Sequence, residues 1–139
     1  MGFTGKSAKT FFDLLVKHSV KRVVDTRRHN KSQLAGFTKG KDLDYFLSKI
    51  GSIQYQHNLD YAPSSDLLKK YRKKMIDWEQ YEKAYLKEIK GRNILDRVKQ
   101  DELENTCFLC SEATADHCHR RVLTEYLVSN FPDLKIIHL

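Results

Sequence analysis

Residues 107–121, which read CFLCSEATADHCHRR, carry the side chains of this chain that are best suited to chemistry. They include all three cysteines of the chain, two of its six histidines and two adjacent arginines. Thiolates and imidazoles act as nucleophiles, bases or metal ligands, and a guanidinium binds carboxylate or phosphate. The segment is therefore a metal site, a catalytic pocket, or a buried strand that leads into a helix.

A zinc site needs four donors, and this segment offers them. The candidate ligands are Cys107, Cys110, Cys118 and His119. In zinc motifs a Cys-x-x-Cys pair usually lies on a tight turn, whereas this pair encloses Phe and Leu and is typical of a strand. Residues three apart on a strand point to opposite faces. The spacing therefore disfavours zinc and predicts that Cys107 is a small buried core residue.

Two roles remain open for the other two cysteines. We expect Cys110 at the carboxyl end of a strand and Cys118 in the first turn of a helix, where free amides lower the pKa of a thiol. Either could be a nucleophile with His119 or His117 as its base, and a buried structural thiol is the plainer alternative. The Cys-x5-Arg spacing of thiol phosphatases is absent, since Arg120 follows Cys110 by ten positions.

The elements that would position these residues alternate between helix and strand. The spacing of apolar residues predicts helices over 7–20, 40–51, 63–75, 77–91 and 116–131, and strands over 21–27, 52–57, 105–110 and 134–139. At most a very short strand precedes the first helix, or the sequence begins just after one. Such alternation favours a mostly parallel sheet with helices on both faces. We expect a three-layer Rossmann-like α/β fold over residues 1–139 as a single domain, with a helical cap inserted at about 64–101.

Polar side chains follow the ends of several predicted strands. In open α/β sheets, ligands bind outside the carboxyl ends of the strands, where such loops meet. There, Asp25 and Glu112 would supply acid–base groups, and Cys118 with His119 would shape or activate the site. Two structural alternatives remain open: Asp25 as the cap of a turn, and Glu112 as the ion-pair partner of Arg120. The residues expected to bind an anion are Arg27, Arg28, Ser32, Cys110 and Arg120.

The net charge of +7 is concentrated in the first third of the chain. Residues 1–50 contain eleven Lys or Arg against four Asp or Glu, whereas residues 51–139 contain fourteen of each. A localised excess indicates an anionic partner such as phosphate, a nucleotide or nucleic acid, and a merely soluble surface is the plain alternative. The aromatic residues of 69–92 fall at helical spacing, so we expect an amphipathic cap there rather than a nucleic-acid surface.

The composition of the chain also indicates its cellular compartment. No apolar run approaches the length that spans a bilayer, and no signal peptide opens the chain. An odd number of cysteines without a secretion signal fits reduced thiols. We therefore expect a cytoplasmic protein with no membrane partner.

Three segments of this chain, VVDTRRHNKSQLAGFTKGKDLDYFL, LDYAPSSDLLKKYRKK and CFLCSEATADHCHRR, closely resemble the family named domain of unknown function 488. Hallmarks of that family are an Asp-x-Arg after a strand, a Ser and a Phe-x-Lys downstream, and a final Leu-x-Cys-x-Glu followed by Cys-His-Arg. Leu109 is displaced by one position, and Asn30 stands where many members carry proline. The segment NLDYAP replaces a commoner Leu-Gly-Gly segment. The matching residues are Asp25, Arg27, Ser32, Phe37, Lys39, Glu112, Cys118, His119 and Arg120.

The resemblance implies an α/β fold with a cluster of polar residues, and it implies no particular reaction or cofactor. Our leading hypothesis is an enzyme, or a ligand-binding domain derived from one, that binds a phosphate-bearing molecule such as a nucleotide or a nucleic-acid end. The first alternative is a non-catalytic nucleic-acid-binding module in which the basic first third follows the backbone. The second is a zinc-stapled interaction domain.

Overall fold

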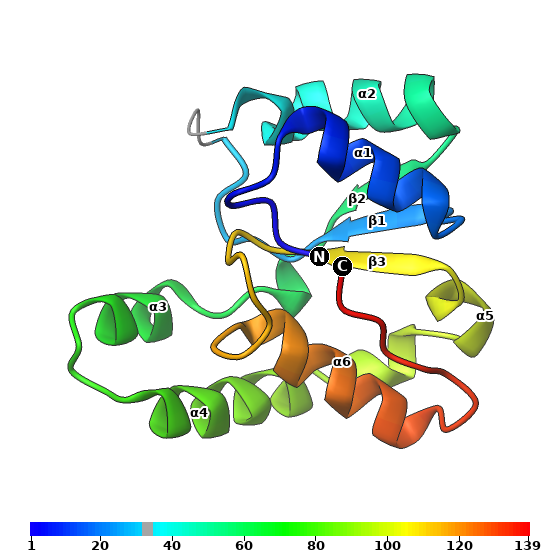
Figure 1. Ribbon diagram of the computed structural model, residues 1–139. Helices are drawn as coiled ribbons and strands as arrows, with labels where there is room; N and C mark the ends of the chain where they lie inside the picture. Colours follow the sequence, from blue (N-terminus) through cyan, green and yellow to red (C-terminus); the bar gives the residue numbers. More distant parts are fainter. Residues whose placement is uncertain (32–34) are drawn as a thin grey trace.

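The structure is a computed structural model that describes residues 1–31 and 35–139. Its sheet has three parallel strands in the order β2-β1-β3, shown in Figure 1. The strands are β1 (Arg22–Asp25), β2 (Gln54–His57) and β3 (Thr106–Leu109). The helices are α1 (Ala8–Lys17), α2 (Gly40–Gly51), α3 (Ser65–Arg72), α4 (Trp78–Gly91), α5 (Gln100–Leu103) and α6 (His119–Asn130), with short 3-10 helices η1 (Gly36–Thr38), η2 (Leu59–Tyr61) and η3 (Ile94–Arg97).

The helices cover both faces of the sheet, as the sequence predicts. In Figure 1, α1 and α2 lie on one face, and α4 and α6 lie on the other. The α1–α2 side encloses a core cluster that includes Phe11 and Val23, and the α4–α6 side encloses a second one that includes Val24 and Tyr85. Adjacent residues of β1 therefore pack into the cores on opposite faces of the sheet. This is why the apolar residues of the strand follow one another and do not alternate with polar ones. The expected α/β fold is confirmed.

Local signals in the sequence set several of the helix starts. The Ser7 side chain accepts a hydrogen bond from the Thr10 amide before α1, and Ser64 caps α3 through the Leu67 amide. Asp77 and Gln80 form a reciprocal capping box at the start of α4, as their spacing predicts. These caps satisfy amides that the first turn of a helix leaves without partners.

None of the helices in the two described ranges is both long and apolar enough to cross a membrane.

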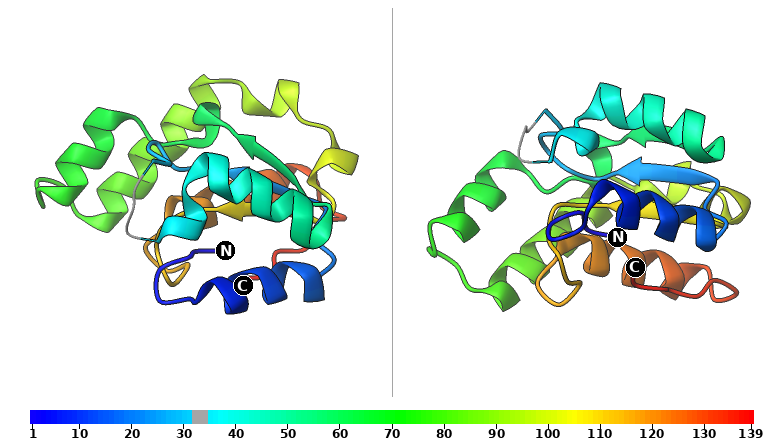
Figure 2. Two further views of the ribbon diagram at one scale, coloured as in Figure 1. Left: turned by 90° about the horizontal axis from the view of Figure 1, so that it is seen from above. Right: turned by 45° about the horizontal axis from the view of Figure 1, so that its top comes forward.

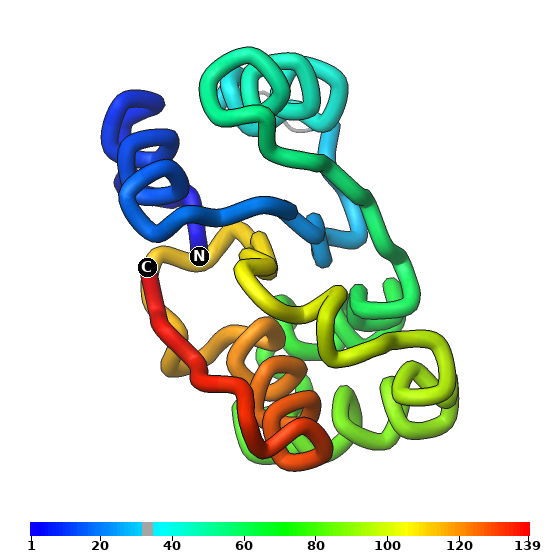
Figure 3. The backbone as a smooth tube through the Cα atoms, turned by 90° about the vertical axis from the view of Figure 1, so that its right-hand side faces the viewer, coloured from blue at the N-terminus to red at the C-terminus, as the bar shows by residue number. Residues whose placement is uncertain are grey.

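The predicted strand over 134–139 is wrong, because this segment forms no strand. Gly2 instead pairs in parallel with Cys110, and the amide of Cys110 donates to the carbonyl oxygen of Met1 at 3.1 Å. The N-terminal segment thus occupies the outer edge of the sheet beyond β3. Figure 3 shows the C-terminal segment running up from α6 to end near the N-terminus. Ile137 is 68% exposed, so this tail lacks the buried apolar face that a strand needs.

The α3–α4 pair projects beyond the carboxyl ends of the strands, as both views in Figure 2 show. A tight turn between the two helices creates this overhang. Lys74 has a left-handed backbone (φ 56°), and its amide donates to the carbonyl of Tyr71 while the amide of Met75 donates to that of Lys70. This is the Schellman arrangement, in which the left-handed residue is usually glycine. The turn returns the chain towards the sheet and places the Lys74 side chain at the carboxyl edge.

The close approach at Gly2 gives a first prediction. A Cβ atom at this position would lie 1.5 Å from the carbonyl oxygen of Glu112, so Gly2→Ala must displace the loop after β3. We expect the free energy of unfolding to fall by about 1–3 kcal/mol, measured by urea denaturation. Gly91→Ala is the matched control, because no atom of the described residues lies within 4 Å of its added Cβ. Equal stability of the two variants would contradict this account of the edge.

Candidate functional site

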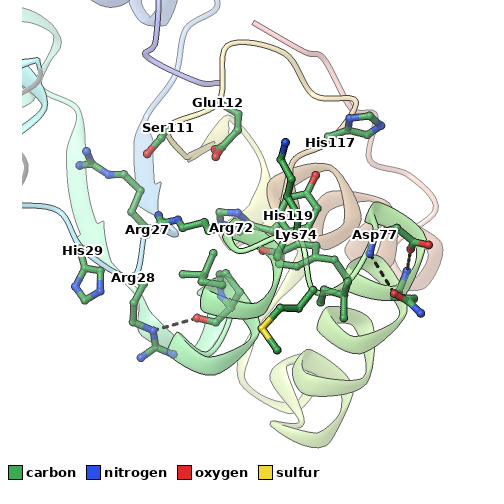
Figure 4. A pocket seen from close by; sticks show the side chains of 17 residues that line it. Arg27, Arg28, His29, Arg72, Lys74, Asp77, Ser111, Glu112, His117 and His119 are labelled. Atoms are coloured by element: carbon green, nitrogen blue, oxygen red, sulfur yellow. Dashed lines mark hydrogen bonds between the residues drawn. The ribbon is translucent and has the colours of Figure 1, made fainter.

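A pocket of about 590 Å³ opens at the carboxyl edge of the sheet. Three parts of the chain that are distant in sequence form its wall: the loop after β1, the α3–α4 segment, and the loop between β3 and α6. Figure 4 shows side chains from all three parts around the same opening. Its charged, hydroxyl and imidazole lining includes Arg27, Arg28, His29, Arg72, Lys74, Asp77, Ser111, Glu112, His117 and His119.

The pocket wall is rich in uncompensated positive charge. Among the described residues, no carboxylate lies within 4.0 Å of the cationic groups of Arg28, Arg72 or Lys74. Arg28 is anchored by a hydrogen bond from its Nε to the carbonyl oxygen of Pro63 at 3.0 Å. Of the two lining carboxylates, Asp77 accepts from the Gln80 amide as the cap of α4. The pocket therefore favours an anion.

An aromatic cluster forms the wall beside these cations. The rings of Tyr71 and Tyr81 lie 4.6 Å apart, and Trp78 stacks on Tyr81 with ring centroids 5.3 Å apart. The imidazole of His117 lies 5.2 Å from Trp78. Burial, reinforced by the charges of nearby Cys118 and Glu112, raises the pKa of Tyr81, so its hydroxyl stays protonated. The cluster offers a planar apolar surface next to the cationic groups.

Asp25 and Arg27 form a buried ion pair behind the pocket. Asp25 is 0% exposed, and Arg27 donates to both of its carboxylate oxygens, from Nε at 2.8 Å and from Nη2 at 2.6 Å. The hydroxyl of Tyr55 donates to Asp25 Oδ2 at 2.7 Å, and Arg27 Nη2 also donates to the carbonyl of Thr38 at 2.7 Å. The Arg27 guanidinium lies over the Phe3 ring. This geometry favours a role for Asp25 in positioning Arg27, because both of its carboxylate oxygens already accept hydrogen bonds.

The second group of predicted site residues gathers around two thiols. The Sγ atoms of Cys110 and Cys118 lie 2.9 Å apart. Nη1 of Arg120 donates to both sulfurs and to the carbonyl oxygen of Glu112, the latter at 2.9 Å. Arg120 is 3% exposed, and its Nε has no partner among the described residues. Cys107 lies on the other face of the sheet, in the core beneath α1, as predicted.

The pKa values of Cys110 and Cys118 are shifted in opposite directions. The hydrogen bond from Cys110 lowers the pKa of Cys118 to about 4, helped by His119 and Arg120 and opposed by burial. Burial and the neighbouring sulfur raise the pKa of Cys110 far above its ordinary value. The opposite directions of these two shifts favour Cys118 as the thiolate and Cys110 as the protonated thiol beside it.

His119 lies between the thiols and the pocket, because it directly follows Cys118 in the chain and its side chain lines the pocket. Its Nε2 lies 2.9 Å from the Thr26 hydroxyl and 3.1 Å from the Thr26 carbonyl oxygen. A carbonyl oxygen only accepts, so Nε2 carries a proton. The ring of Tyr85 packs edge-on against it at 5.6 Å.

Three possible metal donors, from Cys110, Glu112 and Cys118, lie within 4.8 Å of one another. The Arg120 guanidinium donates to both sulfurs of this group, so a cation already neutralises the thiolate there. The four-donor zinc set considered from the sequence is not assembled, because Cys107 and Cys110 belong to opposite faces.

The structure thus separates the predicted residues into groups. Arg28 and Glu112 line the pocket together with His119, whereas Arg120 faces the thiols. Ser32 lies outside the described residues. Arg72 and Lys74 were not predicted as ligand-binding residues, although their basic segment was visible in the sequence.

The buried ion pair gives a second prediction. Asp25→Asn leaves the Arg27 guanidinium buried without a counter-charge, so we expect the free energy of unfolding to fall by about 3–5 kcal/mol in urea denaturation. The double variant Asp25→Asn/Arg27→Met removes both charges and should lose less stability than the single variant. A single variant as stable as the unmodified protein would show that the pair contributes nothing.

Comparison with known proteins gives one match. No curated protein and no solved structure is similar enough to count as a match. The family model described as "Domain of unknown function DUF488" matches residues 7–127, a span that holds all three strands and both groups of site residues. That span is most of the 139-residue chain and supports the resemblance stated from the motifs. The chain belongs to the DUF488 family.

Proposed function

We propose that the pocket at the carboxyl edge binds the phosphate group of a nucleotide or of a nucleic-acid end. The observation that carries this proposal is the convergence of Arg28, Arg72 and Lys74, cations without a carboxylate partner among the described residues, on one pocket. A phosphate presents several acceptor oxygens and up to two negative charges, which match two guanidinium forks and an ammonium group. The placement beyond the ends of parallel strands is where open α/β sheets bind ligands.

The remainder of the pocket supports a ligand larger than phosphate alone. Its volume of about 590 Å³ lies in the range of small-molecule sites. Tyr71 and Tyr81 line the pocket beside the cations. Aromatic rings stack on nucleobases with little regard to base identity. A phosphate on the arginines with a base against Tyr71, which is less buried than Tyr81, is the arrangement that uses both features.

An enzymatic role would rest on Glu112 and His119. Glu112 is exposed at the pocket wall, and among the described residues its carboxylate has no cationic partner within 4.0 Å. It is therefore the lining group suited to accept or deliver a proton next to a bound ligand. His119 is held in one tautomer by Thr26 and would orient rather than exchange protons. Asp25 would act indirectly, by fixing Arg27 and the loop that presents Arg28.

The binding proposal gives a third prediction. Arg72→Ala and Lys74→Ala should each weaken the binding of a nucleoside 5′-monophosphate by about tenfold, because each removes one charged hydrogen bond. Isothermal titration calorimetry measures this, with inorganic phosphate and a 5′-phosphorylated oligonucleotide as further probes. Lys73→Ala is the matched control, since Lys73 neighbours both residues but does not line the pocket.

Two results would count against the phosphate pocket. Unchanged affinity of both lining variants for all three probes would overturn it. Equal losses in Lys73→Ala and the lining variants, with steep salt dependence and binding of the oligonucleotide only, would favour the non-catalytic nucleic-acid-binding module instead.

Lys74 also allows stability and binding to be separated, which gives a fourth prediction. Glycine adopts the left-handed backbone of this position without the steric cost that a lysine meets. We therefore expect Lys74→Gly to keep the free energy of unfolding within about 1 kcal/mol of the unmodified protein. Its affinity for the nucleoside monophosphate should nevertheless fall as in Lys74→Ala. Retained affinity in Lys74→Gly would show that the side chain takes no part in binding.

A further inference from the structure

The two thiols beneath the pocket form a pair that the phosphate proposal does not use. Cys110 Sγ lies at the end of β3 and Cys118 Sγ at the start of α6, and the two atoms are 2.9 Å apart. A disulfide bond is about 2 Å long, so the sulfurs need to approach by only about 1 Å to be joined. Both residues are buried, at 0% and 1% exposure, which shields the pair from larger thiols in solution.

We propose that Cys110 and Cys118 are a redox-active dithiol that a hydroperoxide converts into an intramolecular disulfide. In the first step, the Cys118 thiolate attacks the peroxide, the O–O bond breaks, and an S–O bond forms with the release of hydroxide or alkoxide. The sulfur loses two electrons to the peroxide oxygen and becomes a sulfenic acid. In the second step, Cys110 attacks this sulfur, the S–S bond forms, the S–O bond breaks, and the leaving hydroxide takes the Cys110 proton to give water.

The surroundings assign the attacking role to Cys118. Its sulfur lies 2.9 Å from that of Cys110, and Nη1 of Arg120 donates to it at 3.5 Å and to Cys110 Sγ at 2.5 Å. It also lies in front of the first amides of α6, which favour a negative charge. Burial opposes the charge, yet these donors keep the pKa of Cys118 near 4. Cys110, which holds the proton, is suited to the resolving role.

A small oxidant can approach from the phosphate pocket. The Glu112 carboxylate lines that pocket, and its Oε2 lies 4.0 Å from Cys118 Sγ. His119, which directly follows Cys118 in the chain, lines the same pocket. One layer of side chains therefore separates the thiolate from the opening, and hydrogen peroxide is the smallest hydroperoxide that could pass it.

The arrangement distinguishes a dithiol from a metal site. Two thiolates bound to one tetrahedral zinc ion stand about 3.7 Å apart, given zinc–sulfur bonds of about 2.3 Å. The observed separation of 2.9 Å is shorter than this and lies between that spacing and the length of a disulfide bond. Arg120 already supplies the positive charge at these sulfurs.

A thiol count after oxidation tests the proposal and is the fifth prediction. The reduced protein has three free cysteines. After hydrogen peroxide treatment and removal of excess oxidant, we expect one alkylatable thiol under denaturing conditions, assigned to Cys107 by peptide mass spectrometry. A dithiol reductant should restore all three. Cys107→Ala is the matched control and should lose both of its remaining thiols.

Single-cysteine variants resolve the two steps. Cys110→Ser should accumulate a sulfenic acid on Cys118, because the resolving thiol is absent, and dimedone present while the oxidised protein is unfolded should trap it. Cys118→Ser should keep Cys110 and Cys107 reduced. Thermal unfolding followed by circular dichroism identifies any variant that fails to fold. In that case the thiol counts of the unmodified protein and of Cys107→Ala decide whether the disulfide forms.

The pH dependence adds a second readout. Because the pKa of Cys118 is lowered to about 4, the thiolate is fully formed above about pH 5, and its oxidation rate should stay level from pH 6 to 8. An ordinary thiol, with a pKa of about 8.5, would instead react roughly tenfold faster per pH unit over this range. The proposal is overturned if the protein keeps three thiols in peroxide, if it forms only intermolecular disulfides, or if it purifies with stoichiometric zinc on these cysteines.

Discussion

The parallel pairing of β1 with both of its neighbours is the constraint on which the rest of the structure depends. The register aligns Asp25 with His57 on one side and with Leu109 on the other, so the three strands end at the same level. Each loop that carries polar side chains therefore leaves the sheet at one edge. The strands can hold this register because their backbone hydrogen bonds are buried between two helical layers with separate cores.

Much of the fold follows from patterns in the sequence. Period-2 and helical spacing gave the three strands and the main helices, and capping residues such as Asp77 gave several helix starts. The strand predicted over 134–139 was wrong, because a short apolar run does not reveal whether another segment already pairs with the edge of the sheet. The competing segment at Gly2 has almost no strand signal of its own, and its pairing depends on a close contact with the loop at Glu112.

The site was predictable in part, and the limits have physical causes. Period-2 geometry correctly placed Cys107 and Cys110 on opposite faces. Arg120 was expected to bind an anion from its guanidinium alone, yet side-chain type cannot tell that two sulfurs lie within its reach. Arg72 and Lys74 belong to a helical pair that reads as a packed cap, and their places on the pocket wall depend on where α3 ends and on the left-handed turn at Lys74. The cationic pocket and the buried pair of thiols consequently lie side by side.

The aromatic cluster has a practical consequence. Trp78 is the single tryptophan of the chain, and its ring stacks on Tyr81, tilts against His117 and lies beneath the Arg121 guanidinium. Two of these three neighbours, Tyr81 and His117, line the pocket. Indole emission is sensitive to nearby charge and to contact with imidazolium. The unlabelled molecule therefore contains its own fluorescent reporter, whose intensity should register occupancy of the neighbouring cavity without any attached dye.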